Sequence, residues 1–201
     1  MSKPNLNARF ALVASKTGAH MTIDELLLLI RKSEPPAPLD QLEQLEASLG
    51  VRLPADYRDI LIRCNGGHLG GRLWQFPPAE PGIQVGVNHI YEFRTEPHFS
   101  LAEKRECYQS PGYIRIPLDL LAITDDVFGN AVCIGLRGPH EGKIYFWDHE
   151  LEPPQAEELE PNDVEEPWDG AVETAGNLSV VADSFLQFVS ELRPLEESDD
   201  K

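Results

Sequence analysis

The clearest pattern of apolar and polar positions lies in residues 54–64. Its apolar members have the spacing i, i+3, i+4 and i+7 and are Tyr57, Ile60, Leu61 and Cys64. This spacing predicts an amphipathic helix, and Pro54 suits its start because the N–H that proline lacks would have no helical partner there. Asn65-Gly66-Gly67 should end the helix, since asparagine and glycine tolerate positive φ.

Two shorter helices are predicted before this one. Thr22 and Glu25 have the spacing of a capping box and open a short helix, which ends before the proline-rich residues 34–38. Asp40 is expected to cap the second helix, and Gly50 should end it in a left-handed conformation. The apolar side of the second helix carries Leu42, Leu45 and Leu49.

The middle of the chain carries short runs of β-branched and aromatic residues. The strands that these runs predict span residues 73–76, 83–87, 89–93, 116–124, 131–136 and 143–147. Residues 98–109 are expected to form a helix, and residues 178–192 a final helix with Phe185 and Phe188 on its buried side. Helices first, strands in the middle and one helix last predict an α+β domain.

The same pattern predicts a single domain between two tails. Residues 1–21 lack periodicity and are expected to form a flexible tail, residues 22–193 the domain, and residues 194–201 an acidic tail. Residues 150–170, which prolines interrupt, are expected to form an acidic surface loop. The run Gly18-Ala19-His20-Met21 resembles a vector-derived join, and a native extension fits it equally well.

Charge separates the C-terminal quarter from the rest of the chain. Residues 1–149 hold 15 basic and 18 acidic residues, whereas residues 150–201 hold 2 basic and 16 acidic ones. Nine of these acids lie in residues 150–170, where no base occurs. Such a surface repels phosphate groups and attracts basic proteins. We therefore expect a cationic protein partner and no nucleic-acid partner.

The apolar runs are too short for a membrane span, which needs about 18 residues. The longest run is Leu26 to Ile30, and it belongs to a predicted helix. Lys3 and Arg9 are not followed by the apolar stretch of a secretory signal. We therefore expect a cytoplasmic protein with no membrane partner, and a monomer.

No group of residues has the spacing of a cofactor or metal site. The three cysteines are widely spaced and are expected to be buried free thiols: Cys64, Cys107 and Cys133. The six histidines show no His-x-x-x-His or His-x-x-Glu-His spacing. The glycine-rich residues 66–71 follow the end of a predicted helix, where the negative end of the helix dipole disfavours phosphate.

One enzyme-like alternative is a hydrolase that uses Asp125, Asp126 and His149. The two aspartates resemble an acid/base pair, but they lie in a turn before Gly129, where aspartates usually bond their own backbone. His149 follows a predicted strand, where neighbouring side chains point to alternate faces. We therefore expect no enzyme activity, no catalytic residue, no cofactor and no metal.

Five segments together resemble the SUKH (SMI/KNR-type) family. Residues 42–57 are similar to its opening signature, an acidic amphipathic helix followed by Leu53-Pro54 and, three residues on, the aromatic Tyr57. The other four segments are Asn65-Gly66-Gly67, residues 128–134, residues 142–150 and residues 182–188. The resemblance covers about residues 39–192, and it depends on the order and spacing of the segments.

The resemblance implies a central, mainly antiparallel sheet with N-terminal helices and a C-terminal helix packed on it, and no conserved catalytic group. Bacterial members of the family are mostly immunity proteins for toxins, many of them nucleases, and eukaryotic relatives regulate cell-wall synthesis. The chain would thus be a protein-binding module. It would either neutralise a cognate toxin or act as a regulatory or scaffolding protein on another cellular protein.

Within such a family, the acidic loop is where the choice of partner would lie. Its carboxylates resemble a nucleic-acid backbone in charge, and a tryptophan among them can supply an apolar anchor. The residues expected to bind the partner are Glu157, Glu158, Glu160, Asp163, Glu165, Glu166 and Trp168. The alternative is an ordinary solvated loop. Calcium capture is not favoured, because the acids do not have the spacing of an EF-hand.

Overall fold

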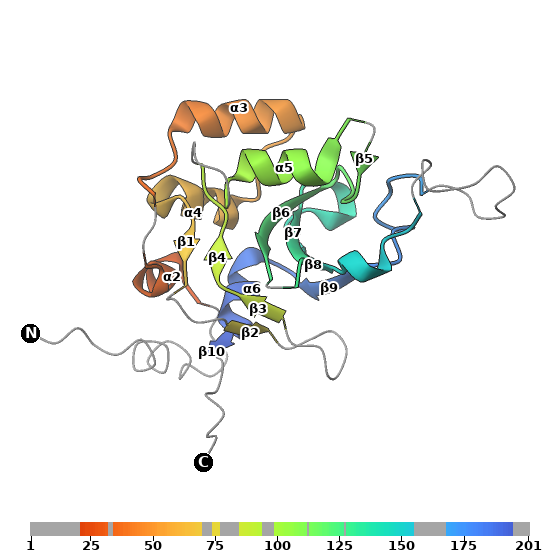
Figure 1. The fold of residues 1–201 in the computed structure, drawn as a ribbon. Helices are drawn as coiled ribbons and strands as arrows, with labels where there is room; N and C mark the ends of the chain where they lie inside the picture. The colour runs from red at the N-terminus through yellow and green to blue at the C-terminus, as the bar shows by residue number, and fades with distance from the viewer. Residues whose placement is uncertain are drawn as a thin grey trace, which may run out of the picture.

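The computed structural model describes residues 21–31, 34–69, 74–76, 85–93, 99–111, 113–126, 128–154 and 168–194. Along the chain these residues form three helices, a group of short strands, a fourth helix, four longer strands and a last helix (Figure 1). Helices at both ends of an antiparallel sheet confirm the predicted α+β class.

The N-terminal helices are α2 (Ile23–Leu29), α3 (Leu39–Leu49) and α4 (Ala55–Cys64). The capping box of α2 is confirmed, since the Thr22 hydroxyl accepts from the Glu25 N–H at 3.3 Å and the Thr22 N–H donates to the Glu25 carboxylate at 2.9 Å. The predicted left-handed cap of α3 is also confirmed, with φ of +67° at Gly50. Asn65 ends α4 in the same way, with φ of +56°.

The predicted cap of α3 at Asp40 is wrong. The helix begins one residue earlier, at Leu39, and Pro38 precedes it with no side-chain hydrogen bond to the first turn. Asp40 lies instead within the first turn, where its negative charge is favourable at the positive end of the helix dipole.

Four antiparallel strands form the main sheet, in the order β6-β7-β8-β9. Their bounds are Leu120–Asp125, Ala131–Gly135, Ile144–Trp147 and Leu178–Ala182. Every residue of β7 and β8 is buried, because helices and loops cover both faces of the sheet centre. The 3₁₀ turn η1 (Gly138–His140) joins β7 to β8.

The short strands form two smaller sheets and one hairpin. β1 (Gly67–His68) pairs with β4 (His89–Ile90), and the second sheet has the order β10-β2-β3. The strands of that second sheet are Trp74–Phe76, Val85–Val87 and Arg193–Pro194. The hairpin strand β5 (Tyr113–Ile114) follows α5.

Helices α5 (Leu101–Gln109) and α6 (Phe185–Glu191) pack on the sheet, α5 against β6 and α6 against β9 and α4. One aromatic pair joins α5 to the sheet, and another joins α6 to α4. Tyr108 of α5 meets Trp147 of β8 edge-on at 5.5 Å between ring centroids, and Tyr57 of α4 meets Phe185 of α6 at 5.3 Å. Full burial of each such ring contributes on the order of 2–3 kcal/mol.

The prediction of one helix over residues 178–192 is wrong in its first half. Residues 178–182 form strand β9, which pairs with β8 so that Leu178 lies opposite Trp147. The β-branched pair Val180 and Val181 favours a strand, and an open edge of β8 is available for pairing. The helix starts only after Ser184, whose hydroxyl accepts from the Gln187 N–H at 3.1 Å.

Candidate protein-binding site

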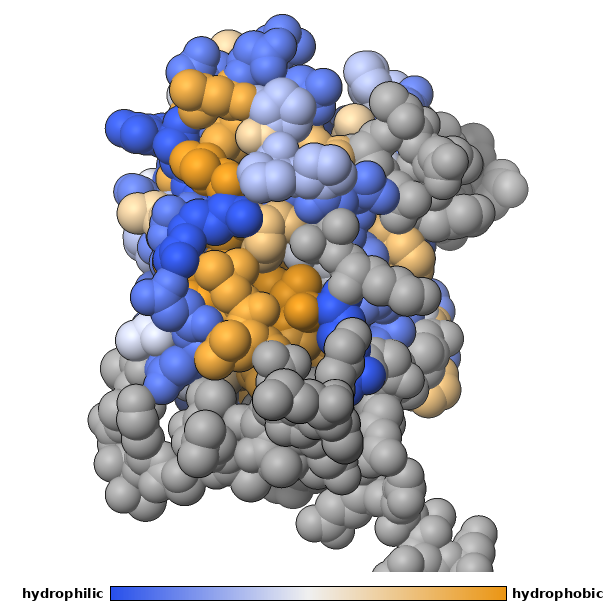
Figure 2. Space-filling model, turned by 90° about the vertical axis from the view of Figure 1, so that its left-hand side faces the viewer, coloured by the Kyte–Doolittle hydropathy of each residue, from blue (hydrophilic) through white to orange (hydrophobic). Residues whose placement is uncertain are grey.

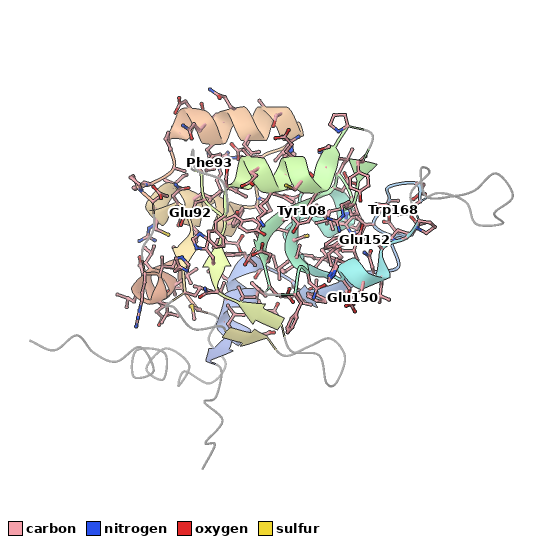
Figure 3. All side chains as sticks on the ribbon, in the orientation of Figure 1. Glu92, Phe93, Tyr108, Glu150, Glu152 and Trp168 are labelled. Carbon is pink, nitrogen blue, oxygen red and sulfur yellow. The ribbon has the colours of Figure 1, made fainter. Side chains whose placement is uncertain are left out.

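The turn between β6 and β7 and the 3₁₀ turn η2 (His149–Leu151) meet at one edge of the main sheet. Residues 155–167, which hold most of the residues predicted to bind the partner, follow just beyond η2 in the sequence. We call them the acidic segment. Figure 3 shows Glu150, Glu152 and Trp168 together on this side of the molecule. We call residues 126–130 and 148–154 the junction.

Asp126 shapes the first half of the junction. Its Oδ1 accepts from the N–H groups of Phe128 at 2.8 Å and Asn130 at 2.9 Å, and its Oδ2 accepts from the Asn130 side-chain amide at 2.9 Å. The carboxylate thus holds the turn by local backbone bonds, as the sequence predicted for aspartates at this place.

Asn130 joins the two halves of the junction. Because its amide nitrogen donates to Asp126, its oxygen faces His149 and accepts from the His149 backbone N–H at 3.1 Å. His149 Nδ1 lies 2.9 Å from the same oxygen and therefore carries the proton. Gly129, with φ of +98°, lies under the ring, and a Cβ at this residue would be 3.6 Å from it.

An ion pair fixes the start of the acidic segment. The Arg115 Nε lies 3.1 and 3.0 Å from the two Glu152 carboxylate oxygens, and its Nη2 also bonds the carboxylate. The guanidinium lies over the rings of Trp147, at 5.1 Å, and Tyr108, at 5.9 Å. The hydrogen bond to Glu152 raises the pKa of Arg115 above its ordinary value, so the guanidinium stays charged.

The two ends of the acidic segment meet at a backbone hydrogen bond. The Trp168 N–H donates to the Pro154 carbonyl oxygen at 3.2 Å. The Trp168 indole N–H donates to the Ala171 carbonyl and the Thr174 hydroxyl, each at 3.1 Å. Asp169 accepts from the Thr174 hydroxyl and the Ala171 N–H, and these bonds lower the pKa of its carboxyl group.

The residues predicted to bind the partner are only partly described. Glu157, Glu158, Glu160, Asp163, Glu165 and Glu166 lie outside the described residues. Trp168 is described and half-buried, and its indole N–H is used in the internal bonds to Ala171 and Thr174. Its role as an anchor for a partner stays a prediction.

Two of the proposed hydrolase residues, Asp126 and His149, meet through Asn130, and all three are engaged in structural contacts. Asp125 bonds Lys104 at 2.6 Å, Asp126 holds its own turn, and His149 bonds Asn130. Among the described residues, no group of three or more His, Cys, Asp or Glu side chains is placed to hold a metal ion. The described helices also include none that is long and apolar enough to cross a membrane.

A buried pair that the sequence analysis missed lies on β4 and just beyond it. His89 Nε2 and Glu92 Oε1 are 3.1 Å apart, and both side chains are almost fully buried. The His89 ring stacks on Phe99 at 4.0 Å between centroids and meets His68 edge-on. Because alternation along a strand does not reveal a buried charged side chain, the sequence carried no signal for this pair.

Two other surfaces are distant from the junction. A groove of about 530 Å³ lies between α3 and α5, where Arg105 donates to Ser48 and the Gln109 amide donates to three backbone carbonyls. Figure 2 shows an apolar patch over α2, where Leu28 is exposed. Neither surface includes a residue of the junction.

One of the cysteine predictions is wrong. All three cysteines are free, and Cys64 and Cys133 are buried as expected, but Cys107 is exposed on α5. It lies on the outer side of that helix, whereas Tyr108 points to the core. Burial raises the pKa of the Cys64 thiol to about 11.

Comparison with known proteins agrees with this architecture. A protein of Bacillus subtilis (strain 168), described as the SPbeta prophage-derived uncharacterized protein YokK, is 28% identical to the chain over 171 residues, which cover 73% of this chain and 85% of that protein. No solved structure matches the chain. The family description SMI1 / KNR4 (SUKH-1) matches residues 36–191, and these include every helix from α3 to α6 and the whole main sheet. The chain therefore belongs to the SMI1 / KNR4 family (SUKH-1).

Proposed function

We propose that the chain is an immunity protein, which binds and neutralises a cationic protein toxin through the acidic region of residues 150–170. The observation that carries this proposal is the charge asymmetry, with 16 acidic and 2 basic residues after residue 149 on a family scaffold that is nearly balanced before it. Clustered charge of one sign speeds the encounter with a partner of opposite sign by about 10- to 1000-fold at low salt.

The fixed ends of the acidic segment support the proposal. The Pro154–Trp168 hydrogen bond and the Arg115–Glu152 ion pair hold both ends against the folded domain. The segment between them therefore starts and ends at fixed points of the described domain. A toxin with a basic cleft, such as a nuclease, has the charge that complements them. Its neutralisation would take place in the cytoplasm.

We also propose that the chain acts without catalysis. The groups that a hydrolase would need are engaged in structural contacts, Asp125 with Lys104, Asp126 with its own turn and His149 with Asn130. The test is a triple variant, Asp125→Ala, Asp126→Ala and His149→Ala. Because Asp126 and His149 also hold the junction, neutralisation should fall no further than the affinity of the variant for the toxin does. A hydrolytic activity that the wild-type chain has and this folded variant lacks would contradict the proposal.

The main test is neutralisation in cells. The basic protein that co-purifies with the chain from its native host is expressed in a bacterial host with and without the chain, and growth is measured. The wild-type chain should restore growth, whereas the variant Glu157→Lys, Glu158→Lys, Glu160→Lys should not. The matched control reverses three exposed acids of α3 and α5, Asp40, Glu43 and Glu106, and should restore growth.

Two results would contradict the immunity proposal. The first is growth that the wild-type chain does not restore although it is expressed and folded. The second is a partner that is a non-toxic cellular protein, which would instead support a regulatory or scaffolding module.

A further inference from the structure

The two most exposed large hydrophobic side chains of the described residues both lie at the junction. Phe128 is 69% exposed in the turn between β6 and β7, and Leu151 is 63% exposed at the end of η2. Single exposed apolar residues are common on protein surfaces and need no explanation. Here two large ones share one structural unit, next to the acidic segment.

Hydrogen bonds bring these two side chains to the same unit. Asn130, two residues after Phe128, bonds the backbone and the ring of His149, which is two residues before Leu151. Gly129 packs directly under that ring. Phe128 and Leu151 therefore flank a single contact between the two turns.

The backbone that carries both side chains is held in place. Asp126 accepts from the Phe128 N–H at 2.8 Å, and Asp148 caps η2 by accepting from the Glu150 N–H at 2.9 Å. Asn177 in turn donates to the Asp148 carbonyl at 2.9 Å. Because the backbone of both turns is already ordered, binding at Phe128 or Leu151 costs less conformational entropy than binding to a mobile loop would.

The charge around the two side chains is negative. Asp148 and Glu150 lie on the same turn as Leu151, and the acidic segment starts beyond Pro154. Two described bases that bond residues at or beside the junction are already paired, Arg115 with Glu152 and Lys104 with Asp125. An apolar centre inside an acidic rim is complementary to a basic surface that contains an apolar pocket.

We propose that Phe128 and Leu151 form the apolar centre of the docking surface, and that its occupant is a basic protein domain with an apolar pocket for Phe128. The proposal deepens the proposed function and rests on it for the class of partner. The described acids Asp148 and Glu150 form a rim that speeds encounter, whereas the two apolar side chains determine how long the complex lasts. Trp168, whose indole N–H is bonded internally, positions the end of the acidic segment.

The first step of the test identifies the partner at this position. The photo-crosslinking residue p-benzoyl-phenylalanine replaces Phe128 in the full chain in its native host, and adducts are identified by mass spectrometry. The matched control carries the same residue in place of Leu39, which is 54% exposed at the start of α3, at the other end of the molecule (Figure 1). A basic protein should be enriched at position 128 over position 39.

The second step measures the affinity of that purified protein for variants of the chain. Phe128→Ala should weaken binding about 30-fold and Leu151→Ala about tenfold, as expected for apolar residues at the centre of an interface. Leu39→Ala should change it less than about twofold. Because all three side chains are largely exposed, each variant should keep the wild-type circular dichroism spectrum and melting temperature, which are measured alongside.

The inference is overturned by any of three results: equal adducts at positions 128 and 39, including none at either; an acidic partner; or wild-type affinity for Phe128→Ala. Its failure is distinguishable from failure of the immunity proposal. A toxin that the chain neutralises even with Phe128→Ala removes the inference and keeps the immunity function. A basic, non-toxic partner whose binding depends on Phe128 keeps the inference and removes the immunity function.

Discussion

The N-terminal helices and the edge around the junction use acidic side chains in different ways. Residues 21–69 hold 5 basic and 8 acidic residues, and ion pairs join them, including Arg58 with Glu46 and Arg63 with both Asp24 and Asp59. Residues 126–177 hold 2 basic and 13 acidic residues. In the described part of that edge, Asp126, Asp148 and Asp169 accept mainly from N–H and hydroxyl groups.

The difference matters because a carboxylate bonded to a neutral donor keeps its full negative charge. An ion pair cancels the charge of both partners at a distance, whereas a backbone N–H fixes the carboxylate and leaves its field in place. The described part of this edge therefore combines a defined shape with carboxylates that keep their charge. In the N-terminal helices, ion pairs such as Arg58 with Glu46 offset part of the acidic charge.

The largest expected effect is on the rate of association. Reversing Glu157, Glu158 and Glu160 to Lys should slow binding of the cationic partner by at least about tenfold at low salt, and should flatten its dependence on salt. Stopped-flow kinetics over a range of salt concentrations measures this. Reversing Asp40, Glu43 and Glu106 changes the net charge equally and should slow binding much less. Equal slowing by both triple variants would remove the difference between the two regions.

A second prediction compares how much two acids contribute to the free energy of unfolding, one that forms an ion pair and one that is exposed. Glu46 accepts from the Leu53 N–H at 2.9 Å and from Arg58 at 3.0 Å in a largely buried setting. Glu46→Ala should therefore lower the free energy of unfolding by about 2–3 kcal/mol. Glu150→Ala, at an exposed residue, should change it by less than about 0.5 kcal/mol. Urea unfolding measures both, and similar losses would contradict the contrast.

A third prediction concerns the rigidity of the junction. Asn130→Ala removes the bonds that connect Asp126 with His149 and should cost about 1–2 kcal/mol of unfolding free energy. Amide hydrogen exchange should rise at Phe128 and His149, while the core strand β7 stays protected. If exchange at Phe128 and His149 is unchanged, the two turns are held together by other contacts.

The smallest expected effect concerns thiol reactivity. At neutral pH one thiol, Cys107, should react quickly with a disulfide reagent, and Cys64 and Cys133 should react only on unfolding. Burial raises the pKa of Cys64 to about 11, so the protonated thiol favours the folded state. This contribution is complete below the unfolded pKa of about 8.5 and is lost as pH rises through 11. Cys107→Ser should abolish the fast phase and nothing else.

The sequence predicted best where local signals and tertiary packing agree. The stripe from Tyr57 to Cys64 and the cap at Gly50 were found because periodicity and backbone conformation act within a few residues. Residues 178–182 were misassigned because their apolar spacing also fits a helix. They form a strand because they pair with the free edge of β8, a tertiary contact that the local sequence does not show. The family resemblance was confirmed because it depended on the order of whole segments.

The site was predictable in composition and not in geometry. An excess of acids in residues 150–170 is a local property of the sequence. In contrast, the contact between Asn130 and His149 and the pair of Arg115 and Glu152 join residues 19 and 37 positions apart, and no spacing rule connects them. The exposure of Phe128 was equally hidden, because the sequence of a turn does not show which other elements cover its side chains.

The Pro154–Trp168 hydrogen bond has a consequence for how such a protein changes over generations. A segment whose two ends already touch can lengthen or shorten without altering the distance that the rest of the chain must bridge. Doubling a closed loop costs only about 0.6 kcal/mol in closure entropy. Residues 155–167 can therefore change in number and sequence while β8 and β9 keep their register.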